Sequence, residues 1–75
     1  MRSLNDIPEG KIGTVKTLLT KGGMRRRLQD IGLIEGTKVK CVQKSPLGDP
    51  TAFLIRGGVI ALRSEDSQKV IIEEN

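Results

Sequence analysis

Short apolar runs, separated at close intervals by glycine and proline, extend through the whole chain. The turn clusters are IPEG, KGG, IEG, SPLGDP and RGG. Apolar runs of about four to eight residues between such turns are typical of a small antiparallel barrel or sandwich. The pattern predicts strands over residues 11–18, 37–44, 51–56, 59–63 and 70–73.

The second predicted strand shows which of its side chains face a core. Val39 and Cys41 fall on one face of this strand, and Lys38 and Lys40 fall on the other. This period of two is typical of a half-buried strand. We therefore expect the Cys41 thiol to point inward.

Glycines punctuate two of the other predicted strands. Ile12 and Val15 have opposite parity in the first strand, and a bulge at Gly13 would turn both side chains inward. Gly57 and Gly58 separate two later strands and can adopt the positive φ that a tight turn requires. We expect a hairpin across this glycine pair.

One helix is predicted, over residues 23–31. Met24, Leu28 and Ile31 recur at positions i, i+4 and i+7, which places them on one apolar stripe. The helix is short, so it depends on packing this stripe against the sheet. We expect an all-β fold, a small barrel, with this single short helix inserted after the first predicted strand.

Small residues are expected to end the helix and shape the turns around it. Gly32 suits the left-handed position after the last helical turn, and Leu33 would then pack back on Leu28 in a Schellman motif. Gly36 belongs to a Glu-Gly turn that leads into the next strand. Ser64 is a candidate N-cap for a single helical turn before the last strand.

Three consecutive arginines occupy residues 25–27, at the start of the predicted helix. Each cation at the positive end of a helix dipole costs roughly 0.3–1 kcal/mol at an exposed site, so local stability does not require them. They are either a solvated face or a patch that grips the carboxylates or phosphates of a partner. On the second interpretation Arg25, Arg26 and Lys21 are candidate partner-binding residues.

A second candidate surface is apolar. Leu33, Ile34 and Leu47 lie in predicted turns, where a small barrel has little room to bury all three. They either pack as a satellite of the core or form an exposed patch for protein contact. The sequence leaves both interpretations open.

Size and charge narrow the class of protein. The chain has 75 residues with one Phe, no Trp and no Tyr, and we expect residues 1–75 to form a single domain with an aliphatic core. The net charge is +4, with +6 in residues 1–44 and −2 in residues 45–75. Such asymmetry favours an acidic partner, which could be nucleic acid, a membrane surface or a protein.

The residues that catalysis, metal binding and nucleic-acid binding commonly use are scarce in this chain. The chain has no His, and its lone Cys41 cannot build a thiolate metal site, so we predict no catalytic residues, no metal ligands and no cofactor. We predict no nucleic-acid partner, because single-strand binding by small barrels uses exposed aromatics and Phe53 lies in an apolar strand. The lone cysteine and apolar runs far shorter than the roughly 20 residues of a membrane span predict a cytoplasmic protein.

Four segments together resemble the FeoA family, small cytosolic proteins of bacterial ferrous iron uptake. They read L..IPEGKIGTV, MRRRLQDIGLIEGTKVKCV, SPLGDPTAFLIRGGVIALR and KVII, and they extend from Leu4 to Ile72. The resemblance implies an SH3-like barrel and a partner, the cytosolic part of the ferrous iron transporter FeoB. It implies an accessory or regulatory role without chemistry of its own.

Two other functions stay as alternatives to the role that the resemblance implies. One is a small basic nucleic-acid-binding barrel, and the other is a metal-responsive regulatory domain. Transition-metal binding, which a family assignment can carry with it, has no strong ligand set in a chain with one thiol and no imidazole. An exposed sheet edge on so small a domain also permits weak self-association.

Overall fold

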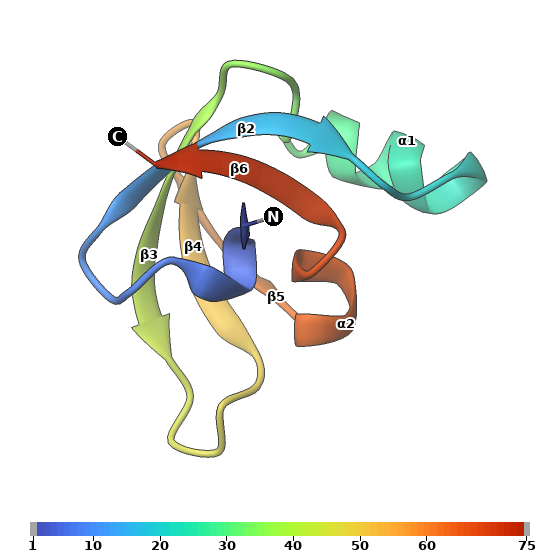
Figure 1. Ribbon diagram of the computed structural model, residues 1–75. Helices are drawn as coiled ribbons and strands as arrows, with labels where there is room; N and C mark the ends of the chain where they lie inside the picture. Colours follow the sequence, from blue (N-terminus) through green and yellow to red (C-terminus); the bar gives the residue numbers. More distant parts are fainter. Residues whose placement is uncertain (1, 75) are drawn as a thin grey trace.

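The computed structural model describes residues 2–74, which form one curved antiparallel sheet of six strands (Figure 1). In chain order the elements are β1 (Arg2–Ser3), the 3-10 helix η1 (Leu4–Asp6), β2 (Ile12–Leu18), α1 (Gly22–Asp30), β3 (Lys38–Lys44), β4 (Thr51–Ile55), β5 (Gly58–Leu62), α2 (Ser64–Ser67) and β6 (Val70–Glu74). The strand order is β1-β6-β2-β3-β4-β5, so the sheet does not close and β1 and β5 form its edges. The predicted all-β fold is confirmed, as an open rather than a closed barrel.

The predicted strands and the helix are each found to within one residue at either end. β1 and η1 were not predicted, because they are too short to show a period. A capping box begins η1, because the backbone N–H of Ser3 donates to Asp6 Oδ2 at 2.8 Å and the Ser3 hydroxyl accepts from the backbone of Asn5. This segment seats Leu4 in the core, where it is fully buried.

The core is aliphatic and surrounds a single aromatic ring. Phe53 on β4 is fully buried, and so is Cys41, which lies opposite it on β3. The inward position predicted for Cys41 is therefore confirmed. The other fully buried side chains of large volume are Leu4, Leu28, Leu33, Ile55, Val15, Val39 and Val70.

The prediction of a bulge at Gly13 was wrong. The register of β2 against β6 shifts between Val15 and Thr17, and Ile12 is 43% exposed on the outer face of the sheet. Gly13 serves close packing instead, since a Cβ at this position would lie 2.7 Å from Ile72 Cδ1 and 3.0 Å from Ile7 Cδ1.

The predicted β4–β5 turn and the predicted N-cap of α2 are each displaced by one residue. The β4–β5 hairpin turns through Arg56 (φ 49°) and Gly57 (φ 82°), not through the glycine pair, as a two-residue turn with positive φ at both positions. Arg63 is the N-cap of α2, and Ser64 lies inside this helix. The backbone N–H of Ser64 donates instead to Asp49 Oδ1 at 2.8 Å.

The end of α1 has the predicted Schellman motif. The backbone N–H of Leu33 donates to Leu28 O at 3.0 Å, and that of Gly32 donates to Gln29 O at 3.0 Å. Gly32 has φ +108° and Leu33 is buried, so the chain turns back against the sheet. The predicted apolar stripe is confirmed, with Leu28 buried and Met24 and Ile31 partly buried against the core.

Replacing Gly32 with alanine is expected to destabilise the domain more than replacing Gly36. Both glycines have positive φ, which costs a residue with a Cβ roughly 1–2 kcal/mol. At Gly36 the added Cβ meets nothing within 4 Å, whereas at Gly32 it would lie 2.8 Å from Arg56 Cδ and 3.2 Å from Ile55 Cγ2. Urea unfolding of both variants measures the difference, and equal losses would show that the crowding at Gly32 relaxes without cost.

Candidate protein-binding surface on α1

Helix α1 lies beyond the C-terminal end of β2, at one side of the sheet (Figure 1). Three predicted partner-binding residues are exposed here: Lys21, Arg25 and Arg26. Lys21 is the N-cap of α1, and its side chain makes no capping hydrogen bond. The helix therefore presents a cluster of cations to solvent.

The predicted position of the arginines relative to the helix dipole was wrong. Because α1 begins at Gly22, Arg25 and Arg26 lie in its second turn, and Arg27 lies in its last turn, where the dipole favours a cation. The dipole effect falls off within the first turn, so these charges cost the helix less than expected. What favours a recognition surface on α1 is the exposure of these cationic side chains and the contacts that they make.

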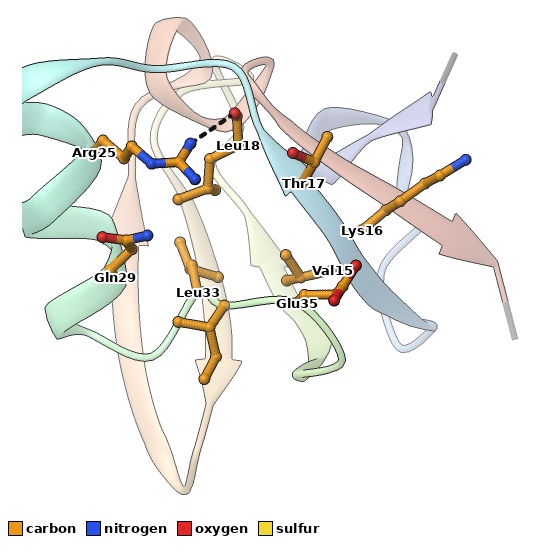
Figure 2. Close-up of a pocket in the computed structure, with 9 residues that line it drawn as sticks. Val15, Lys16, Thr17, Leu18, Arg25, Gln29, Leu33 and Glu35 are labelled. Atoms are coloured by element: carbon orange, nitrogen blue, oxygen red, sulfur yellow. Dashed lines mark hydrogen bonds between the residues drawn. The ribbon is translucent and has the colours of Figure 1, made fainter.

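Arg25 joins α1 to β2. Its Nη1 donates to the carbonyl oxygen of Leu18 at 3.0 Å, as Figure 2 shows. The N–H of Leu19 donates to Lys69 O on the β6 side at 2.7 Å, so the Leu18 carbonyl points the opposite way, toward α1. In the described part of the chain, β3 pairs with β2 at Ile12, Gly13 and Thr14, and no strand covers the rest of β2 on the α1 side.

A hollow of about 290 Å³ lies between α1 and this part of β2. Arg25 and Gln29 from α1 face Thr17 and Leu18 from β2 across it (Figure 2). The other lining residues are Val15, Lys16, Leu33, Ile34 and Glu35. Small-molecule pockets usually measure about 300–1,000 Å³, so this hollow is sized for one or two side chains of a partner.

The structure brings together three of the predicted partner-binding residues, Arg25, Leu33 and Ile34, around this hollow. Ile34 is 40% exposed and offers apolar surface there. Leu33 is fully buried, so it supports the hollow from the core and is not itself a contact residue. This corrects its assignment as a partner-binding side chain.

Leu47 lies apart from the hollow. It is 93% exposed in the β3–β4 loop, which is at the bottom of Figure 1. Ile34 precedes β3 and Leu47 follows it, so the two residues lie beyond opposite ends of a seven-residue strand, which is about 20 Å long. The single apolar patch of Leu33, Ile34 and Leu47 is therefore not formed.

Three other residues that line the hollow were not predicted from the sequence. Lys16 stands between the two residues where the register of β2 shifts, and Gln29 and Glu35 face the hollow from α1 and the following loop. The bulge that exposes Lys16 depends on pairing with β6, which is distant in sequence. No local pattern could have identified it.

The described part of the chain offers little for metal or redox chemistry. Among the described side chains, residues 2–73, no group of three or more Cys, Asp or Glu is placed to hold a metal ion, and the chain has no His. Burial raises the pKa of the Cys41 thiol, so this group stays protonated at neutral pH. The surface on α1 is suited to binding by charge, hydrogen bonds and shape.

Within residues 2–74, no helix has the length and apolar character of a membrane-spanning segment.

Comparison with known sequences identifies relatives. The FeoA domain family matches residues 2–74. A Fe(2+) transport protein A/Fe(2+) transporter FeoB fusion protein of Porphyromonas gingivalis is 29% identical over 70 residues, which cover 93% of this chain and 8% of that protein. The chain thus spans less than a tenth of this curated relative.

Comparison with solved structures agrees with the sequence match. The solution structure of a FeoA protein from Chlorobium tepidum is 27% identical, with a TM-score of 0.90 over 97% of this chain and 70% of that chain. A zinc complex of FeoA from Stenotrophomonas maltophilia, described as a procaryotic SH3 domain protein, is 23% identical and shares the fold, with a TM-score of 0.86 over 97% of this chain and 91% of that chain. With its family match over nearly the whole chain, this SH3-like protein belongs to the FeoA family, which is linked to ferrous iron transport.

Proposed function

We propose that this chain is a non-enzymatic cytoplasmic accessory or regulatory protein of bacterial ferrous iron uptake, which binds the cytosolic part of FeoB. The observation that carries the proposal is the Porphyromonas gingivalis relative, whose name joins Fe(2+) transport protein A and FeoB in one fusion protein. Fusion holds two modules at a high effective concentration. Where the modules are separate chains, a binding surface must replace the covalent link.

The cationic surface of α1 and the adjoining hollow are the proposed contact. Arg26 and Lys21 are exposed and provide positive charge, while Arg25 is held in place by its hydrogen bond to the Leu18 carbonyl. Arginine grips carboxylates with a rigid fork, so acidic side chains of the partner are the expected counterpart. Ile34 adds apolar contact at the edge of the same hollow.

The nucleic-acid alternative finds no support in the exposed surface. Base stacking on aromatic side chains supplies much of the binding energy of single-strand-binding barrels. Phe53 is the only aromatic residue of the chain, and it is fully buried. Binding would have to rely on phosphate contacts alone, which a net charge of +4 supports poorly.

Charge reversal at Arg25 and Arg26 is expected to weaken binding to the soluble cytosolic part of FeoB at least tenfold, or about 1.4 kcal/mol. Arg26→Glu alone should weaken binding in the same direction, and it leaves the Arg25 hydrogen bond to β2 intact. Lys11→Glu is the matched control, because Lys11 is exposed before the opposite end of β2. Isothermal titration calorimetry measures all three affinities.

Equal affinities for wild type, Arg26→Glu and the double variant, with folding intact, would remove α1 from the proposed contact. Equal losses for Lys11→Glu and Arg26→Glu would show that overall charge, not this surface, determines binding. Absence of binding by the wild-type chain would contradict the proposed function itself.

A further inference from the structure

Strand β5 leaves an edge of the sheet open beside α1. Among the described strands it pairs with β4 alone, and it stands last in the strand order. The two-residue turn makes Ile55 and Gly58 the hydrogen-bonded closing pair, so that Val59 and Ala61 direct their N–H and C=O groups away from β4. In residues 2–74 no other backbone segment hydrogen bonds to these groups.

A groove of about 320 Å³ runs between this edge and α1. Met24 and Ile31 line it from the helix, and Ile60 and Leu62 line it from β5. The C-terminal end of α1 approaches the β4–β5 turn, since a Cβ on Gly32 would lie 2.8 Å from Arg56 Cδ. An open edge of backbone groups therefore adjoins an apolar groove.

The charges around the groove favour an acidic occupant. Arg27 and Arg63 line it and are exposed, whereas Asp66 is the one acidic residue among its lining residues. The lining therefore carries a net positive charge. On the edge strand itself, the Val59 side chain is 63% exposed and offers apolar surface beside the groove.

We propose that the β5 edge and its groove bind an extended acidic segment of the partner by strand addition. The segment hydrogen bonds to the backbone of Val59 and Ala61 as a further strand of the sheet. A carboxylate on the segment pairs with Arg27 or Arg63. This inference rests on the proposed function, because it names the chemistry of the segment that the cytosolic part of FeoB would supply.

The geometry of a strand predicts the pattern of the bound segment. Successive side chains point to opposite faces, so every second side chain enters the groove between Met24 and Ile60. These positions should be apolar and of moderate size. The intervening side chains lie beside Val59 on the outer face, and an aspartate or glutamate belongs near the end of the segment that reaches the arginines.

Amide hydrogen exchange, followed by NMR on the full chain with and without the soluble cytosolic part of FeoB, tests the inference. The amides of Val59 and Ala61 are expected to exchange at least tenfold more slowly in the complex. The amide of Ile60 is the internal control, because it already faces β4. Exchange at residues 59 and 61 that is unchanged in the complex overturns strand addition at this edge.

Ala61→Pro tests the same hydrogen bonds by mutation. Proline is tolerated on edge strands where the N–H faces outward, so the variant removes one docking donor. Its affinity for the cytosolic part of FeoB is expected to fall at least tenfold, whereas Ala61→Thr, which keeps the N–H, retains affinity. Should Ala61→Pro fail to fold, the exchange measurement on wild type decides alone.

The outcomes separate this inference from the proposed function. Binding that neither protects residues 59 and 61 nor depends on Ala61 overturns the strand addition and leaves the proposed function standing. Absence of any binding overturns both. Protection of these amides in the chain alone, rising with its concentration, would assign the edge to a second copy and overturn the acidic segment.

Discussion

Replacing Phe53 with alanine is expected to remove about 3–5 kcal/mol from the free energy of unfolding. The ring is fully buried on β4 and is the only aromatic group of the chain. Domains are stable by roughly 0.05–0.15 kcal/mol per residue, which gives about 4–11 kcal/mol for one of this length. The variant should therefore be largely or wholly unfolded at moderate temperature, as circular dichroism and urea titration would measure.

Leu47→Ala is the control for this prediction. Leu47 is 93% exposed, so its truncation should change stability by no more than about 0.5 kcal/mol. A Phe53→Ala variant as stable as Leu47→Ala would contradict the placement of the ring at the centre of the core.

Leu28→Ala is expected to cost about 2–5 kcal/mol and to loosen the docking of α1. Leu28 is the only residue of α1 classed as buried within the described chain, and it carries the Schellman contact with Leu33. A helix of nine residues has little stability of its own. Urea titration measures the cost, and faster exchange of the α1 amides than of the β2 amides would show that the helix opens separately.

Gln29→Ala is the matched control on the same helix. Gln29 is exposed, and alanine has a slightly higher helix propensity, so this variant should be as stable as wild type or slightly more stable. Equal losses for Leu28→Ala and Gln29→Ala would contradict the apolar stripe as the anchor of α1.

The strands and the helix were predictable because local patterns determine them. Turn residues at short intervals bound each strand, and Met24, Leu28 and Ile31 repeat with the helical period. The Schellman end of α1 followed from Gly32 for the same reason. Local chemistry decides such features, and the neighbours along the chain are sufficient to show it.

Features that depend on distant strands were not predictable. The register shift between Val15 and Thr17 arises from pairing with β6, and Gly13 is small because Ile7 and Ile72 close over it. The open edge of β5 follows from the failure of the sheet to close, which no single segment encodes.

The candidate site was predictable in part. The cations of α1 stood out as an unbroken run, and Arg25 and Ile34 do share one hollow. The hydrogen bond from Arg25 to Leu18 depends on how α1 folds back toward β2, which the sequence did not indicate. Leu33 was predicted both to pack against Leu28 and to contact a partner. The Schellman motif turns the Leu33 side chain inward, where it is buried in the core.

Co-purification from native membranes tests whether this chain binds FeoB. The wild-type chain, immobilised by one terminus, is incubated with detergent-solubilised bacterial membranes that contain the ferrous iron transporter. FeoB is expected to be retained by wild type and by Lys11→Glu, and in smaller amount by Arg26→Glu. Failure of the folded wild-type chain to retain FeoB would contradict the proposed function.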